Sequence, residues 1–168
     1  MIRYPAKAFI GDTFCYFAGM AFAVVGILGH FSKTLLLFFL PQIFNFLYST
    51  PQLFGLIPCP RHRLPHFNPS TGLLEPSYAP LPLPPAGLAK GLLTTLSAVG
   101  LLSLRRDPNG TIIACSNFTI LNLILVRRGS MREDRLAREM LALQVLGSGM
   151  AFLIRYGGAG TFYDSSRR

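Results

Sequence analysis

Phe9-Ile10-Gly11-Asp12-Thr13 is the stretch that decides the fold, because one carboxylate here stands directly before a charge-free run. No Lys, Arg, Asp or Glu occurs from Thr13 to Ser32, which is long enough for a helix to cross a bilayer. An acid at this boundary either caps the helix by accepting backbone N–H groups or holds a cation at the membrane surface. The position alone favours the cap. Both roles can coexist, since one oxygen can cap while the other binds a metal.

The composition indicates a membrane protein. Mean hydropathy is +0.42, and charged residues make up 14% of the 168-residue chain, against about a quarter in soluble domains. The net charge of +9 could indicate nucleic-acid binding, but the basic residues are scattered among apolar runs rather than gathered in a patch. We therefore expect a lipid bilayer as a partner and no nucleic acid.

Three segments are predicted to span the membrane, and the first, Phe14–Gly29, lies within the charge-free run already quoted. The second, Thr34–Ile57, also lacks charged residues and contains Pro41, which we expect to kink the helix rather than end it. Gln42 and Asn45 in this run should face a partner helix. The third is expected at about residues 136–156. Glycines in the first and third segments should let neighbouring helices approach closely.

A long proline-rich region separates the second and third spans. Its prolines exclude a long helix over 58–85, and the turn signal Asn68–Gly72 predicts a short β-hairpin. Gly87–Leu104 is predicted to form an amphipathic helix at the membrane interface. Thr111–Ala114 and Phe118–Val126 are β-branched and apolar, which is consistent with strands or with the start of a helix.

The predicted fold is therefore an all-α polytopic membrane protein with about three transmembrane helices and a large cytosolic loop containing a short β-hairpin and an amphipathic helix. Residues 1–57 hold two transmembrane helices, residues 58–135 the loop, and residues 136–168 the last transmembrane helix and tail. Most basic residues lie in this loop, so the positive-inside rule makes it cytosolic. Because spans alternate in direction, Asp12 should lie on the same face.

The segment Pro58-Cys59-Pro60-Arg61-His62-Arg63-Leu64-Pro65 is the main candidate for ligand binding. Arg side chains match pairs of phosphate oxygens, and His62 can donate or accept a proton near neutral pH. The simpler interpretation is a basic patch that touches anionic lipid headgroups. The loop alone favours that interpretation.

Three further features are expected to be ordinary. Cys15, Cys59 and Cys115 are widely spaced and should be unpaired thiols. Arg132, Arg135 and Arg138 should each reach an acid three or four positions away on one helix, as in a pair of Arg135 with Glu139. The glycosylation sequons at Asn109 and Asn117 should remain unmodified if the loop is cytosolic.

Four motif segments closely resemble the C-terminal part of the eukaryotic UDP-N-acetylglucosamine–dolichyl-phosphate N-acetylglucosaminephosphotransferases, a family of polyprenyl-phosphate phosphosugar transferases. These segments are 9–20, 26–34, 41–49 and 58–63. The match is near-continuous over residues 9–78, weakens over about 79–110 and recovers loosely over 115–156.

This resemblance implies a multi-pass endoplasmic reticulum enzyme whose active site faces the cytosol. The family transfers GlcNAc-1-phosphate from UDP-GlcNAc to dolichyl phosphate with Mg²⁺, giving GlcNAc-diphosphodolichol and UMP, the first step towards protein N-glycosylation. By resemblance, Asp12 is a catalytic Mg²⁺ ligand and Phe9 packs on uracil. Arg61, His62 and Arg63 line the pyrophosphate and GlcNAc pocket. Without the resemblance, Phe9 could equally be a lipid anchor.

The family also carries an Asp-Asp motif, a second metal ligand and a phosphate-binding lysine in an N-terminal portion that this sequence does not contain. We therefore expect this chain to be a fragment, a truncated gene product or a short isoform that is inactive alone. An alternative is a non-catalytic membrane protein that packs against the full-length enzyme through its glycine-rich helices. A third is a structural protein with a lipid-binding basic loop. Homodimer formation is left open.

Overall fold

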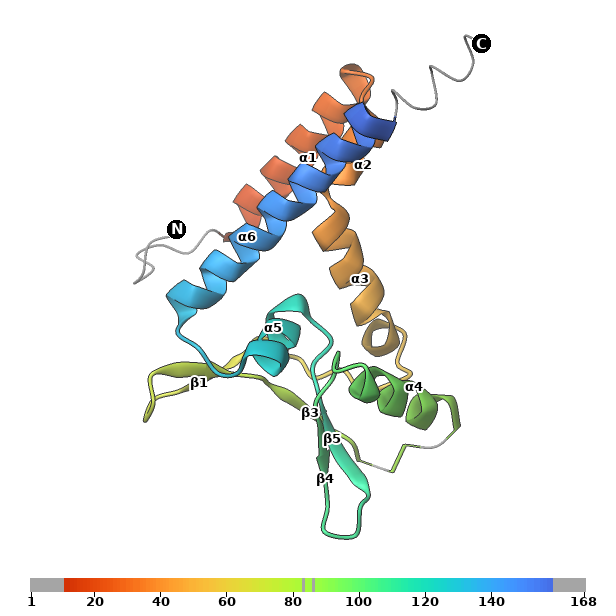
Figure 1. The fold of residues 1–168 in the computed structure, drawn as a ribbon, viewed down its shortest axis with the longest axis vertical. Helices are drawn as coiled ribbons and strands as arrows, with labels where there is room; N and C mark the ends of the chain where they lie inside the picture. Colours follow the sequence, from red (N-terminus) through yellow and green to blue (C-terminus); the bar gives the residue numbers. More distant parts are fainter. Residues whose placement is uncertain (1–10, 83, 86, 159–168) are drawn as a thin grey trace. The chain divides into compact units, whose positions relative to one another are not determined.

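The computed structural model describes residues 11–82, 84–85 and 87–158. The chain divides into two compact units. Figure 1 shows the chain as a ribbon coloured along the sequence. Of the described residues, 11–43 and 140–158 form what we call the helical unit, and those between 44 and 139 form the mixed unit. Two helices, α3 and α6, run from one unit into the other.

The helical unit is held together by aromatic and amide contacts between its helices. The ring centroids of Phe38 and Phe152 lie 5.2 Å apart. Gln42 Nε2 donates to Gln144 Oε1 at 2.8 Å, so Gln42 faces a partner helix as predicted. The elements that contribute to this unit are α1 (Gly11–Leu28), α2 (Ser32–Phe38), α3 (Leu40–Leu53), α6 (Glu133–Phe152) and the π-helical turn η1 (Leu153–Gly158).

Two glycines allow close approach in this unit. A Cβ atom at Gly26 would lie 2.6 Å from Leu35 Cδ2, and one at Gly147 would lie 2.9 Å from Pro41 Cγ. Both distances are shorter than van der Waals contact, so a larger residue would require the Leu35 side chain or the Pro41 ring to move. The expected role of small residues is confirmed at these two positions.

The second apolar run is not one helix, because it breaks next to Pro41. Helix α2 ends at Phe38 and α3 begins at Leu40. Proline has no N–H, and its ring clashes with the carbonyl four residues earlier, here that of Leu37. The backbone N–H of Phe39 points back to the carbonyls of Leu36 and Leu37 instead. The expected kink is therefore a full interruption of the helix.

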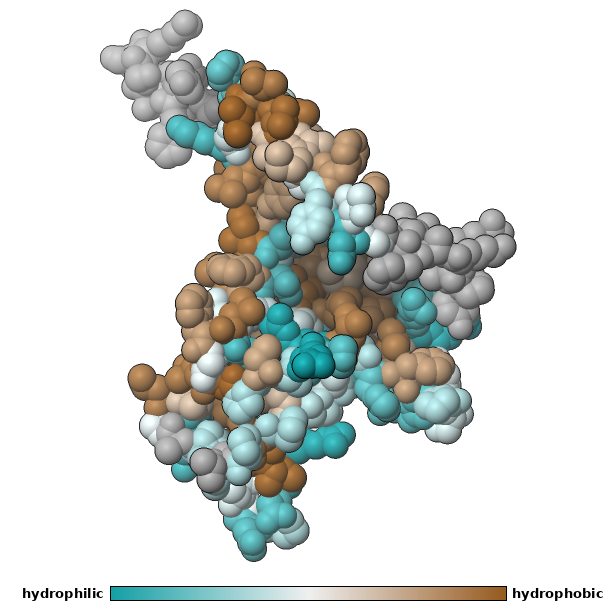
Figure 2. All heavy atoms as spheres, turned by 180° about the vertical axis from the view of Figure 1, so that it is seen from behind, coloured by the Kyte–Doolittle hydropathy of each residue, from teal (hydrophilic) through white to brown (hydrophobic). Residues whose placement is uncertain are grey.

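Two of the described helices are long and apolar enough to cross a membrane. They cover Gly11–Leu28, with a mean hydropathy of 1.6, and Glu133–Gly157, with a mean hydropathy of 1.3. Only 6% of each apolar window is buried, unlike the core helix of a soluble protein. Figure 2 shows hydrophobic side chains covering much of the helical unit. Membrane character is supported, but the predicted count of about three spans is not confirmed.

The mixed unit contains two small antiparallel sheets, so the protein is mostly helical rather than all-α. The predicted hairpin is confirmed as β1 (His66–Asn68) paired with β2 (Leu73–Glu75). The second sheet has the order β3-β5-β4, made by Tyr78–Pro80, Ile112–Ser116 and Leu104–Arg106. Pro80 is tolerated because β3 is an edge strand.

Two helices complete the mixed unit. The helix expected over Gly87–Leu104 is confirmed for α4, Gly87–Ala98, and ends where Gly100 adopts a φ of +74°. The ambiguous pattern over 118–126 is a helix, α5 (Ile120–Arg128), because Thr119 Oγ1 caps it by accepting the backbone N–H of Asn122. The main core contains Tyr48, Ile57, Ala79, Leu93, Leu102, Cys115 and Phe118.

The cysteines are all unpaired, as predicted, but differ in exposure: Cys15 and Cys59 are exposed and Cys115 is buried. Burial raises the pKa of the Cys115 thiol to about 11. We expect maleimide at pH 7.5 to label Cys59 and leave Cys115 unmodified until the chain is denatured, because Cys115 is neither accessible nor ionised. Peptide mapping by mass spectrometry checks this, and equal labelling of both in the folded chain would contradict the core described above.

Candidate functional site

Asp12 lies in the first turn of α1, where a negative charge is favoured by the helix dipole. The residue is exposed, and its carboxylate has no hydrogen bond or ion pair with any residue that the structure describes. The predicted side-chain cap is therefore not seen. No described residue occupies the oxygens of Asp12. Its neighbour Gly11 has a φ of +71°, a conformation that a residue with a side chain rarely adopts.

Phe9, the other predicted residue of this segment, lies outside the described residues. Asp12 belongs to the helical unit, whereas Arg61, His62 and Arg63 belong to the mixed unit. The structure therefore describes the two parts of the predicted site separately. It brings the three basic residues together in one segment.

That segment connects α3 to β1 and has no regular secondary structure over residues 58–65. Arg61 and His62 are exposed and have no side-chain partner among the described residues. Arg63 is half-buried, and its Nη1 is buried without a hydrogen-bond partner. A buried donor without an acceptor is costly, so Arg63 is suited to receive an acceptor oxygen from a ligand.

Other arginines of the mixed unit have structural roles. The Arg105 guanidinium lies 4.1 Å from the ring centroid of Tyr78. Arg127 donates to the carbonyls of Gly100 and Val99 at 2.7 and 2.9 Å, and so satisfies groups that follow α4. These side chains are already engaged by the protein, whereas Arg61 and Arg63 have no side-chain hydrogen bond within the part of the chain that the structure describes.

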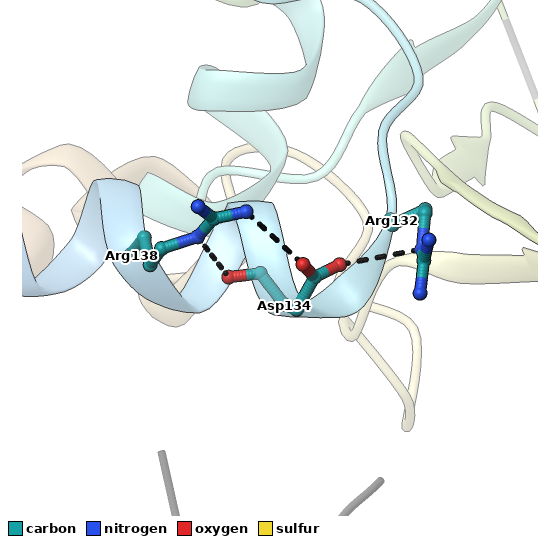
Figure 3. A network of polar contacts seen from close by, with 3 residues as sticks. All are labelled: Arg132, Asp134 and Arg138. Atoms are coloured by element: carbon teal, nitrogen blue, oxygen red, sulfur yellow. Dashed lines mark hydrogen bonds and ion pairs between the residues drawn. The ribbon is translucent and has the colours of Figure 1, made fainter. Parts of the chain in front are cut away.

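The start of α6 carries a further charged cluster. Figure 3 shows Asp134 between Arg132 and Arg138, at 3.4 and 3.0 Å. Arg138 therefore reaches an acid four positions away, as predicted. Glu139 pairs with Arg128 at 3.0 Å, so the expected pair between Arg135 and Glu139 is wrong. Arg128 comes from α5 and reaches Glu139 across the fold, which spacing along one helix could not reveal.

Two buried carboxamides hold the basic segment, and neither was predicted from the sequence. Gln52 Nε2 donates to the Pro58 carbonyl, and Asn122 Nδ2 donates to the Arg63 carbonyl. The sequence did contain a signal for these two residues, because Gln52 and Asn122 are each a single amide among apolar neighbours. The same signal correctly singled out Gln42, and Asn45, whose Oδ1 accepts the backbone N–H of Ile120 at the start of α5.

Within the described residues, no group of three or more His, Cys, Asp and Glu side chains could hold a metal. Asp12 offers carboxylate oxygens alone. Mg²⁺ prefers oxygen ligands and is commonly held by one or two carboxylates together with water and substrate phosphates. Asp12 therefore fits Mg²⁺ as a contributor of a single protein ligand, and does not by itself form a site.

Comparison with protein-family profiles finds no match. Comparison with curated proteins finds relatives that share one name, UDP-N-acetylglucosamine–dolichyl-phosphate N-acetylglucosaminephosphotransferase. The Saccharomyces cerevisiae protein is 56% identical over 155 residues, covering 92% of this chain and 35% of the relative. The Schizosaccharomyces pombe protein is 55% identical, covering 91% and 35%, and the Dictyostelium discoideum protein is 46% identical, covering 91% and 28%.

These identities over nearly the whole chain relate it to a class of phosphotransferase enzymes. The relatives are the GlcNAc-phosphotransferases named above, and the resemblance predicted from the motifs is confirmed. The chain spans about a third of the length of the curated relatives it matches, at 35%, 35%, 28% and 27%. This coverage is consistent with the predicted match to a C-terminal portion.

Proposed function

We propose that this chain forms part of a transferase that moves GlcNAc-1-phosphate from UDP-GlcNAc to dolichyl phosphate, giving GlcNAc-diphosphodolichol and UMP. The observation that carries the proposal is 56% identity, over 92% of the chain, to a protein named for this reaction. The reaction is the first step of lipid-linked oligosaccharide synthesis. The proposed location is the endoplasmic reticulum membrane, with the active-site face towards the cytosol.

The segment with Arg61, His62 and Arg63 is proposed to bind the diphosphate and GlcNAc of the donor. Two guanidinium groups that have no acceptor among the described residues can each present paired N–H donors to phosphate oxygens. Charge accumulates on the leaving UMP as the dolichyl phosphate oxygen attacks. Donors already aimed at that charge lower the barrier.

Asp12 is proposed to contribute one carboxylate ligand to Mg²⁺, and Phe9 to stack on the uracil ring. When bound, Mg²⁺ would supply charge neutralisation at the diphosphate. The exposure of Asp12 and the absence of a partner among the described residues support this role. Its proposed position on the same membrane face as Arg61 follows from the charge distribution of the sequence.

We propose further that the 168-residue chain alone does not catalyse the transfer. It spans 35% of the yeast relative, and the described residues contain no complete cluster of metal ligands. A chimera supplies the rest, with this chain replacing the matched part of the Saccharomyces cerevisiae protein. The alternative, a non-catalytic membrane protein that packs against the complete enzyme, predicts an inactive chimera and co-purification of the chain with that enzyme.

In the active chimera, Asp12→Asn should lower kcat by at least ~100-fold. This loss is larger than that expected for changing a residue that only hydrogen-bonds to a metal ligand. A cap without a catalytic role predicts near-normal turnover and a loss of ~1 kcal/mol of stability. Steady-state assays with radiolabelled UDP-GlcNAc, with thermal unfolding alongside, separate the two. The unmodified 168-residue chain serves as the inactive reference, and turnover by it would refute its proposed dependence on the remainder.

Arg63→Lys should raise the KM for UDP-GlcNAc about tenfold, because lysine cannot form the forked pair of hydrogen bonds. Arg135→Lys is the matched control, since Arg135 also lacks a side-chain partner among the described residues but lies on α6. Kinetics of the two chimeras give the comparison. If the KM for UDP-GlcNAc is unchanged in both chimeras, the segment contacts lipid and does not bind the donor.

Positions 12 and 62 should be labelled from the same side of the membrane. Single cysteines, Asp12→Cys and His62→Cys, in a chimera whose other cysteines are replaced should react with an impermeant maleimide in sealed right-side-out microsomes. Each should also react after permeabilisation. Protection of only one of them in sealed vesicles would separate the two halves of the proposed site.

A further inference from the structure

The segment from Pro58 to Arg63 is fixed at its first residue by Gln52, near the end of α3. Gln52 Nε2 donates to the Pro58 carbonyl at 3.2 Å and to Asn117 Oδ1 at 3.0 Å. Gln52 Oε1 accepts the backbone N–H of Phe118 at 2.9 Å. The side chain is 1% exposed, so these bonds do not compete with water.

The last residue of the segment is fixed by Asn122, in the first turn of α5. Asn122 Nδ2 donates to the Arg63 carbonyl and to Thr119 Oγ1, each at 2.8 Å. Its Oδ1 accepts the backbone N–H of Ser77 at 2.8 Å. Turning this amide over would place its oxygen against the Arg63 carbonyl, so the orientation is determined by its partners.

The two anchors are connected to each other. Asn117 Nδ2 donates to Ser77 Oγ at 2.8 Å, and that hydroxyl lies 3.2 Å from Asn122 Oδ1 and 3.4 Å from the Arg63 carbonyl. A continuous series of hydrogen bonds therefore runs from the Pro58 carbonyl through Gln52, Asn117, Ser77 and Asn122 to the Arg63 carbonyl. The basic segment and this series form a closed ring, which we call the amide ring.

We propose that Gln52, Asn117, Ser77 and Asn122 are positioning residues that hold Arg61, His62 and Arg63 in a conformation ready for an anionic diphosphate. The nature of the ligand rests on the proposed function; the restraint of the segment does not. A segment without helix or strand hydrogen bonds would otherwise lose conformational entropy when the ligand orders it, and fixing it beforehand removes that cost.

The restraint is testable on the full chain through Cys59, an exposed residue inside the ring. The chain with Cys15→Ala is labelled at Cys59 with a nitroxide in lipid nanodiscs, while buried Cys115 stays unlabelled. Asn122→Ala removes the hold on Arg63, and Ser77→Ala is the milder variant in case Asn122→Ala does not fold. We expect a larger mobile component in the electron paramagnetic resonance spectrum of each folded variant.

Tyr48→Phe is the matched control. Tyr48 Oη donates to the Leu101 carbonyl, so this variant also loses a hydrogen bond of the mixed unit but touches no part of the amide ring. Its spectrum should equal that of the parent chain. Unchanged label mobility in Ser77→Ala and in folded Asn122→Ala would overturn the proposal, as would an equal change in Tyr48→Phe.

The catalytic consequence is measured in the yeast chimera. Asn122→Ala should lower kcat/KM about tenfold, the equivalent of about 1.4 kcal/mol and one neutral hydrogen bond, at an unfolding midpoint like that of Tyr48→Phe. A mobility change in a chain whose parent chimera is inactive would reject the proposed function and support the positioning role. An active chimera with no mobility change in the variants would reject only the positioning role.

Discussion

Backbone polar groups that are buried outside helices and strands must find side-chain partners, and this constraint shapes the mixed unit. The chain has no regular structure between α3 and β1, where most residues are exposed, or between β5 and α5, where Asn117 and Phe118 are buried. Carboxamides bond the carbonyls of Pro58 and Arg63, the N–H group of Phe118 and, between β2 and β3, the N–H group of Ser77. Each carboxamide offers a donor and an acceptor, so a few of them connect segments far apart in the sequence.

The same constraint explains an asparagine that the sequence presents as a glycosylation acceptor. Asn117 is 1% exposed, and both atoms of its amide are bonded, to Gln52 and to Ser77. Thr119, the third residue of the same sequon, caps α5. The motif is therefore a structural device in this fold. Residue types alone could not distinguish a glycosylation site from a buried hydrogen-bonding asparagine, because both have the same Asn-x-Thr sequence.

Local signals carried the features that were predicted correctly from the sequence. The hairpin turn, the helix of residues 133–152 and the close approach at Gly26 each depend on neighbours along the chain or on one residue's size. The β3-β5-β4 sheet was not predicted. Its strands pair residues far apart in the sequence, such as Ala79 with Cys115, and no local pattern indicates such a pairing. Of the candidate site, the sequence identified the basic segment but not its anchor Asn122, which depends on the same long-range folding.

The distribution of exposure over the basic segment bears on which ligand it suits. Attraction to a lipid surface is long-ranged, depends on salt and works through exposed charges, so it gains nothing from burying a guanidinium nitrogen. Arg61 is exposed, but Nη1 of Arg63 is buried and the Arg63 carbonyl is bonded to Asn122. A donor that is held in place and partly removed from water has already lost hydration when the chain folds. It therefore bonds strongly only to an acceptor oxygen that reaches its position. Such a donor favours a discrete phosphate group over a diffuse headgroup layer, and Arg63 therefore separates the two interpretations more sharply than Arg61 does.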